Sequence, residues 1–314
     1  MLHLTTGQVQ FFTDNGYLSL ESLAVPEEIP GIWISLETLI RERAGENEGA
    51  YGELISQADE AAGPNSPQIL NPVNYASKLH KTRCFQNALH IAKQLLGNEA
   101  RFFLDVTILK TANSGVGTAW HQDAAYRDPR FEYHDIAIWL PLQSVKVESG
   151  CLQFIPGSHR NGLLKHGWVN NDPRSQALQC TAPFDEAGAV ACPLPAGGCT
   201  IHHPLALHFA GPNLSNLPRF AYIMTFGITP IPAKQPCDFP WLVGRETPNQ
   251  VRRRRWMRRG GLFITDWRRI RRREVMGWRS MVYWLKRFAR TIRIGAQHCS
   301  ASSFQSPASP GARL

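Results

Sequence analysis

The sequence has few of the features that mark secreted, disulfide-linked or membrane-spanning chains. Its seven cysteines are scattered, odd in number and without a Cys-x-x-Cys pair, which argues against a disulfide framework and against a structural zinc site. No basic segment followed by an apolar run stands at the start, and no run of 18 apolar residues occurs. We therefore expect a cytoplasmic protein.

Acidic residues are scarce at one end of the chain only. Residues 245–314 carry seventeen arginines and one lysine against three acidic residues, a net charge of +15, whereas the first 244 residues have a net charge of −6. The overall charge of +9 is thus that of an acidic globular part with a basic tail. Charge alone gives no reason to expect nucleic acid on the globular part.

Hydrophobic residues make up 43% of the 314 residues, enough for a sizeable core. Apolar residues recur at helical spacing at 4–16, 31–44 and 85–96, whereas residues 49–71 are typical of a loop. Short β-rich segments separated by Pro, Gly and Asn predict strands at residues 17–20, 102–110, 135–140, 151–155, 199–203, 206–210 and 220–228. The predicted architecture is a β sandwich or barrel with helices packed outside it.

One tetrapeptide, WHQD at residues 120–123, carries side chains suited to a metal. In a β-strand, residues i and i+2 point to the same face, so His121 and Asp123 would present an imidazole and a carboxylate side by side. His208 supplies a second histidine far downstream. Two histidines and one carboxylate on one face of an ion leave the opposite face open, which suits a non-haem Fe(II) centre that activates dioxygen. The short motif alone recurs by chance, so other segments must decide.

Four sequence blocks occur together in this chain. They are LTTGQVQFFTDNGY at 4–17, WHQD at 120–123, GCLQFIPGSHR at 150–160, and LHFAGPN at 207–213 followed by Pro218 and Arg219. In content and order they resemble the phytanoyl-CoA dioxygenase family of Fe(II)- and 2-oxoglutarate-dependent oxygenases, over roughly residues 4–243. The resemblance implies a mainly β domain with flanking helices (α+β), a cupin-like double-stranded β-helix or jelly roll, in residues 1–244.

By the same resemblance, His121, Asp123 and His208 are the iron ligands. Arg219 lies eleven residues beyond His208, a spacing similar to the family's, and its guanidinium fork matches the distal carboxylate of 2-oxoglutarate in a bidentate pair. His202 and His203 precede Pro204, and this context favours a strand and turn over a metal site.

Three further residues are candidates for cosubstrate binding. Trp139 stands where the family has an aromatic wall beside the cosubstrate, although a plain core position remains an alternative. Lys110, at the end of an expected strand, and Gln122 could supply polar contacts. In a regular strand Gln122 would point away from the face of His121 and Asp123, which counts against it.

The resemblance implies a hydroxylase. It would oxidise an unactivated carbon of a small molecule (lipid-like, acyl or secondary metabolite) with dioxygen and 2-oxoglutarate, releasing succinate and CO2. Asp123 distinguishes the site from halide-binding versions, in which a small residue replaces the carboxylate. Residues 50–80, 124–134 and 161–190 would form a variable lid, and Tyr126, Arg127 and Tyr133 could contact substrate. The substrate, its site of oxidation and the oligomeric state stay open, as does the choice between hydroxylation and a related desaturation or ring closure.

The basic tail at residues 245–314 allows several interpretations. Apolar residues at mostly helical spacing from Trp278 to Ile292 could form a basic amphipathic helix, followed by a Ser/Pro-rich disordered end. Such a tail could bind an anionic membrane or single-stranded nucleic acid. This binding could be weak and accompany an active domain, or it could be the main function of an inactive β-helix scaffold. Its abrupt Arg-Trp repetition is also typical of out-of-frame translation or a mispredicted exon. The final Ala312-Arg-Leu314 loosely resembles a peroxisomal address, an alternative to the cytoplasm.

Overall fold

The computed structural model describes residues 1–54, 66–172, 175–235, 238–243 and 246–261. A first compact unit runs from Met1 to Arg259, and the second, Gly260–Leu314, lies almost wholly outside the described residues. The amphipathic helix, the disordered end and the terminal tripeptide therefore stay predictions. Among the helices of the described segments, none is both long and apolar enough to cross a bilayer.

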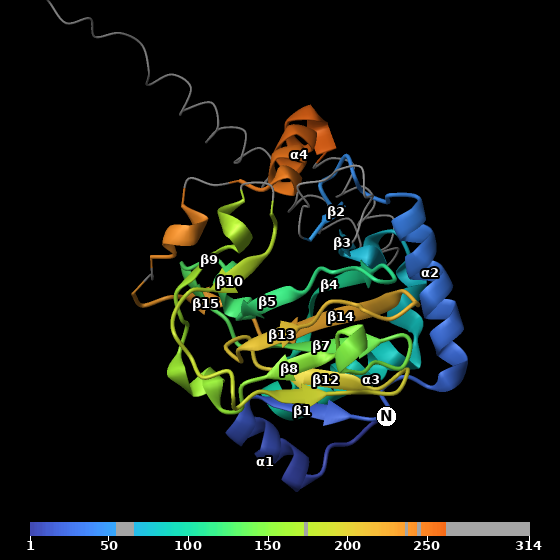
Figure 1. The fold of residues 1–314 in the computed structure, drawn as a ribbon, viewed down its shortest axis with the longest axis vertical. Coiled ribbons are helices and arrows are strands. Elements are labelled where there is room, and N and C mark those ends of the chain that lie inside the picture. Colours follow the sequence, from blue (N-terminus) through green and yellow to red (C-terminus); the bar gives the residue numbers. More distant parts are fainter. Residues whose placement is uncertain (55–65, 173–174, 236–237, 244–245, 262–314) are drawn as a thin grey trace, which may run out of the picture. The chain divides into compact units, whose positions relative to one another are not determined.

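A major antiparallel sheet forms the centre of the first unit (Figure 1). Its seven strands are, in spatial order, β1 (Tyr17–Leu20), β12 (Cys199–His202), β7 (Asp135–Pro141), β14 (Arg219–Gly227), β4 (Arg101–Lys110), β3 (Pro67–Leu70) and β2 (Tyr51–Glu53). Strands distant in sequence are neighbours, since β14 pairs with both β4 and β7.

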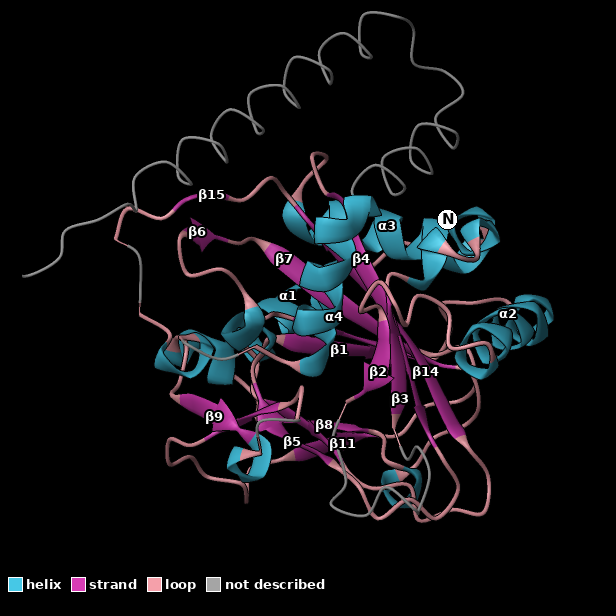
Figure 2. Ribbon diagram, turned by 90° about the horizontal axis from the view of Figure 1, so that it is seen from above, coloured by secondary structure: helices cyan, strands magenta, loops and turns pink. Residues whose placement is uncertain are grey.

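A minor antiparallel sheet faces the major one. Its order is β11 (Val190–Cys192), β8 (Leu152–Phe154), β13 (His208–Ala210) and β5 (Thr118–His121). Two small ribbons flank it, β9 (His166–Trp168) with β10 (Leu178–Cys180), and β6 (Phe131–Glu132) with β15 (Ile231–Pro232). Figure 2 separates β5, β8 and β11 from the major-sheet strands β2, β3 and β14. The two-sheet arrangement confirms the predicted double-stranded β-helix.

Three of the four α-helices of the described residues, all but the last, pack against the outer face of the major sheet (Figure 1). The α-helices of the described residues are α1 (Thr6–Asn15), α2 (Ile29–Arg41), α3 (Arg83–Leu96) and α4 (Pro248–Trp256). Shorter helical turns are η1 (Pro26–Glu28), η3 (Pro72–Asn74), η4 (Ser77–Lys81), η5 (Asp123–Tyr126), η6 (Val147–Ser149), η7 (Ser158–Asn161), η8 (Val169–Asn171), η9 (Pro240–Leu242) and η10 (Met257–Gly261). The helix expected at residues 4–16 begins with a capping box between Thr5 and Gln8.

Alternation along the central strands divides the core into two layers. In β7, Ile136, Ile138 and Leu140 pack against the helices, whereas Trp139 faces the minor sheet. β14 follows the same rule, with Phe220 and Phe226 on the helix side. Because successive strand residues point to opposite faces, the intervening residues of β7 and β14 line the space between the sheets, where the site lies.

Two sequence expectations differ from the structure. Residues 49–71, expected as a loop, contain β2 and β3, which extend one edge of the major sheet. Both strands are short, with Gly52 inside β2, the edge strand, and Pro67 at the first position of β3. A strand tolerates Gly or Pro at such positions, but both residues weaken the sequence signal for a strand. The domain boundary expected after residue 244 also differs, since the first compact unit includes α4 and ends at Arg259.

Candidate metal centre

Two antiparallel neighbours, β5 and β13, bring the expected histidine ligands together. His121 ends β5 and is the cross-strand partner of His208, which opens β13. Gln122 continues in extended conformation, and Asp123 then begins η5, so the carboxylate returns to the side of His121. The ligand atoms of His121, Asp123 and His208 all lie within 4.8 Å of one another. The structure therefore confirms that the three predicted ligands form one cluster.

Hydrogen bonds fix the orientation of both imidazole rings. Nδ1 of His121 lies 2.7 Å from the carbonyl oxygen of Ala119, and Nδ1 of His208 lies 3.0 Å from that of Ala206. If each Nδ1 donates its proton to that carbonyl, Nε2 keeps a lone pair, the usual arrangement at metal-binding histidines. Burial lowers the pKa of His121 and takes that of His208 well below its usual value, which favours neutral rings.

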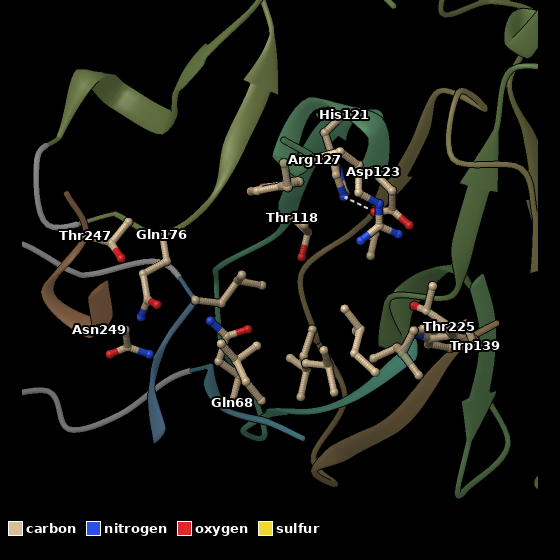
Figure 3. Close-up of a pocket in the computed structure, with 18 of the residues that line it drawn as sticks. Gln68, Thr118, His121, Asp123, Arg127, Trp139, Gln176, Thr225, Thr247 and Asn249 are labelled. Carbon is tan, nitrogen blue, oxygen red and sulfur yellow. Dashed lines mark ion pairs between the residues drawn. The ribbon is translucent and has the colours of Figure 1, made fainter. Parts of the chain in front are cut away.

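Both carboxylate oxygens of Asp123 lie near imidazole nitrogens. Its Oδ1 lies 3.8 Å from Nε2 of His121 and 3.8 Å from Nε2 of His208. Its Oδ2 lies 3.2 Å from Nε2 of His202. Burial alone would raise the pKa of Asp123, but the hydrogen bond from His202 and the three nearby imidazoles bring it well below the usual value. The carboxylate is therefore ionised, as binding of a cation requires. Figure 3 shows Asp123 beside His121.

Arg219 and Trp139 lie together on the facing sheet. Both are buried, and the guanidinium carbon of Arg219 lies 5.5 Å from the centre of the Trp139 ring. Burial lowers the pKa of Arg219 to about 10, so the group stays charged at neutral pH. Its Nε has no hydrogen-bond partner within the described residues. A buried guanidinium without an acidic partner is costly, and this orphaned donor fits the carboxylate of a keto acid.

Gln122 has a structural role in place of the predicted cosubstrate contact. Its Nε2 donates to the carbonyl oxygens of Gly162 and Leu205 at 2.9 and 2.7 Å, and its Oε1 accepts from the amide of Leu164 at 2.7 Å. The amide thus has no N–H left for a ligand. It ties the end of β5 to two loops and holds the ligand strand in place.

Lys110 is fully buried behind the cavity wall. Its Nζ donates to the carbonyl oxygens of Ala210 and Gly211 at 2.9 and 2.7 Å. Burial, followed by the nearby charge of Arg219, lowers its pKa well below the usual value. Lys110 is the cross-strand partner of Arg219. Through its hydrogen bonds to Ala210 and Gly211, it anchors the end of β13 beside the site. Its contact with cosubstrate stays a prediction.

A cavity of about 440 Å³ opens between the two sheets. It is lined by the three ligands, Arg219 and Trp139, and by residues from each of the three expected lid segments, Gln68, Arg127 and Gln176 among them. Of the predicted substrate contacts, Tyr126 and Arg127 line the cavity. Tyr133 lies outside its wall, with the Arg127 guanidinium 5.7 Å from its ring centre. Arg127 also pairs with Asp135 at 2.8 Å.

Sequence reasoning assigned no site role to His202. Its strand, β12, points Cys199 and Ile201 toward the helices, so Thr200 and His202 face the cavity side. A histidine at the inward position of an apolar strand was the available signal. His202 does not join the ligand cluster within the described residues, but it hydrogen-bonds the ligand Asp123.

The fold and the cluster define a non-haem Fe(II)- and 2-oxoglutarate-dependent oxygenase. The sequence pattern of the family described as phytanoyl-CoA dioxygenase (PhyH) matches residues 12–221. The chain belongs to this family. Its metal cofactor is Fe(II), which His121, Asp123 and His208 would hold, and its cosubstrates are 2-oxoglutarate and dioxygen.

Relatives and solved structures agree with this assignment. A phytanoyl-CoA dioxygenase of Arabidopsis thaliana is 24% identical over 250 residues, covering 70% of this chain and 87% of the relative. A probable alpha-ketoglutarate-dependent hypophosphite dioxygenase of Stutzerimonas stutzeri is 26% identical and covers 68% and 74%. The structure of EvdO2 from Micromonospora carbonacea var. aurantiaca, complexed with 2-oxoglutarate, has a TM-score of 0.66 and 31% identity, covering 76% of this chain and 97% of that one.

Proposed function

We propose that the protein hydroxylates an unactivated carbon of a small molecule. One carbon–hydrogen bond becomes carbon–hydroxyl with one atom of dioxygen, and 2-oxoglutarate takes the other as it loses CO2 and becomes succinate. The observation that carries the proposal is the complete ligand set opening into the cavity that also contains Arg219. Fe(II), when bound, supplies the activation of dioxygen.

The chain's own residues position the reactants. His121, Asp123 and His208 occupy one side of the centre and leave the cavity side free. Arg219, with Trp139 beside it, offers a charged fork to the distal carboxylate of 2-oxoglutarate. The intact carboxylate of Asp123 favours hydroxylation over halogenation and argues against an inactive scaffold.

The cavity favours a substrate with a substantial apolar part. Leu104, Val106 and Ile108 of β4 line it, as do Leu152 and Ile223. Apolar walls of this kind bind carbon skeletons by burial and leave orientation to a few polar groups. A lipid-like, acyl or secondary-metabolite substrate fits this lining.

The decisive experiment is reconstitution of the full chain with Fe(II) and 2-oxoglutarate without oxygen, followed by oxygen and a metabolite library. We expect succinate in step with a product heavier by one oxygen atom. Succinate in the absence of any such product would support the oxygenase class but not hydroxylation. No succinate under any condition would overturn the proposal.

Replacement of Asp123 tests the ligand assignment. Asp123→Ala should abolish succinate formation and lower Fe(II) affinity, because the site loses its one carboxylate. Glu132→Ala, at an exposed position, is the control and should retain both. Wild-type turnover by Asp123→Ala with added Fe(II) would show that the ligands are wrongly assigned.

A further inference from the structure

The cavity has a second polar end made of residues that the metal centre does not use. Four carboxamides and one hydroxyl line it, from Gln68, Gln176, Asn249, Gln250 and Thr247. Figure 3 shows Gln68, Gln176, Thr247 and Asn249 grouped away from His121 and Asp123, with carbon-only side chains between the two groups. We call these five residues the carboxamide end.

Gln68 has an amide with unused hydrogen-bonding capacity. Its side chain belongs to β3, only 5% of the residue is exposed, and it lines the cavity. Among the described residues, no hydrogen bond reaches its amide oxygen or nitrogen. Buried polar side chains are almost always hydrogen-bonded, so an amide left free against a cavity indicates a missing partner in that cavity.

Asn249 adds a free donor. It is 3% exposed and lies in α4, in the segment that sequence analysis assigned to the basic tail. Its Oδ1 accepts a hydrogen bond from Arg252, which fixes the orientation of the amide. Its Nδ2 then has no partner within the described residues. Figure 3 shows this nitrogen on the side of Asn249 nearer the other cavity residues.

Gln176 and Gln250 each keep one half of their amide free. Nε2 of Gln176 donates to the carbonyl oxygen of Glu53 at 2.5 Å, which leaves Oε1 as an acceptor. Oε1 of Gln250 accepts from the amide of Thr247 at 2.7 Å, which leaves Nε2 as a donor. The carboxamide end therefore offers both donors and acceptors and carries no charge.

Gly52 allows two of these amides to approach the same point on β2. It lies in β2, and a Cβ at its position would stand 2.5 Å from Oδ1 of Asn249 and 2.7 Å from Nε2 of Gln176. Real Cβ atoms essentially never approach other atoms so closely. Any larger residue at position 52 would therefore displace the side chains of Asn249 and Gln176.

We propose that the carboxamide end binds a neutral group bearing hydroxyl or carbonyl oxygens, at the opposite end of the substrate from the carbon that is oxidised. A hydroxyl both donates and accepts, as this set of groups requires. A phosphate or carboxylate only accepts and prefers guanidinium forks, and the free oxygen of Gln176 would repel it. Arg253 is the one cation among the described residues that line this end, and it is exposed.

The inference rests on the proposed function and names its substrate class. Full-length protein loaded with Fe(II) and 2-oxoglutarate without oxygen is titrated by calorimetry with hexyl β-D-glucoside, hexyl phosphate and hexanol. These probes share an apolar chain and differ in the end group. We expect the glucoside to bind about tenfold more tightly than either other probe, a difference that a few hydrogen bonds can supply.

Two variants locate the binding. Gly52→Ala and Gln68→Leu should each weaken glucoside binding about fivefold to tenfold and leave hexanol binding unchanged. Gly31→Ala is the matched control, because Gly31 lies in α2 and a Cβ there meets no atom within 4 Å. Each variant must keep the visible absorption of the Fe(II)–2-oxoglutarate complex, which shows that it is folded.

The outcomes separate the two proposals. Tightest binding of hexyl phosphate would show an anion site and overturn the inference, as would equal binding of all three probes or glucoside binding that both variants leave unchanged. Wild-type protein that shows neither the absorption band nor succinate in air would overturn the proposed function instead. Probe selectivity is measured independently of that band, so either proposal can fail alone.

Discussion

The two carboxylate oxygens of Asp123 have different neighbours. Oδ1 lies near the two histidine ligands, whereas Oδ2 is held by His202 from the facing sheet. A partner of this kind orients a ligand and withdraws one oxygen from the ion. His202 thus acts through Asp123 and is a positioning residue for the metal centre.

His202→Phe should weaken Fe(II) binding about tenfold or more, the usual cost of losing a partner that orients a ligand. The variant keeps an aromatic ring at this position and loses the hydrogen bond to Asp123. Anaerobic titration with Fe(II) gives the dissociation constant. His134→Phe, at an exposed position, should bind Fe(II) as the wild type does. Equal affinity in the two variants would mean that His202 is plain core.

Arg219→Lys should raise the KM for 2-oxoglutarate about tenfold to a hundredfold, because an ammonium cannot form the bidentate pair. Steady-state succinate formation at varied 2-oxoglutarate measures the effect, with a smaller change expected in kcat. Arg160→Lys, in a turn that contacts the carbonyl oxygen of Asp14, should change neither constant. A wild-type KM in Arg219→Lys would remove Arg219 from cosubstrate binding.

At the scale of elements, apolar β-rich segments were predictable as strands, whereas β2 and β3 were not. β1 was expected at residues 17–20 and is found there, and β4, β7 and β14 lie within a residue or two of their expected positions. β2 and β3 contain Gly52 and Pro67, which local propensity assigns to loops. β3 pairs with β4, and β2 pairs with β3. These pairings, which a local sequence pattern does not reveal, make both segments strands.

The residues of the candidate site also divide into those that the sequence predicts and those that it does not. The ligands could be predicted because His121, Asp123 and His208 stand in ordered motifs. Residues that reach the site only through the fold could not be predicted from the sequence. His202 and Asn249 are two examples. The site role of Asn249 was also difficult to recognise because the neighbouring arginines made residues 245–314 resemble a basic tail.

α4 belongs to the catalytic unit, and truncation can test this. A chain ending at Arg259 should keep succinate formation and its melting temperature, because the first compact unit ends there. A chain ending at Val243 should melt several degrees lower and lose substrate-coupled product, since the buried Thr247 and Asn249 are removed. Identical melting and turnover in both truncations would show that α4 is dispensable.

At the scale of the whole molecule, a buried acid makes stability depend on pH. Asp105 is fully buried in β4, accepts a hydrogen bond from the Tyr222 hydroxyl at 2.7 Å, and has an Oδ1 without a partner. Burial raises its pKa from 3.8 to about 7. A raised pKa means that the folded state favours the neutral acid. The contribution of Asp105 is therefore complete below about pH 4 and is lost as pH rises through about 7.

Asp105→Asn should remove this decline, which amounts to at most about 4 kcal/mol for a shift of about three units. Urea unfolding at pH 5.5 and 8.5 gives the two free energies, and their difference should shrink in the variant. Asp14→Asn, on the exposed side of α1, should keep the wild-type difference. An unchanged difference in Asp105→Asn would place the pH dependence elsewhere.

The pairing of His121 with His208 across β5 and β13 has a thermodynamic consequence. A bound ion joins two segments far apart in the chain, and it does so only while the strands are in this register. A slip of one residue would turn a ligand to the other face. The ion therefore acts as a reversible cross-link of the native state, adding about 2.7 kcal/mol at a hundredfold excess over its dissociation constant. Two preparations with different iron content would then differ in folding stability while sharing every covalent bond.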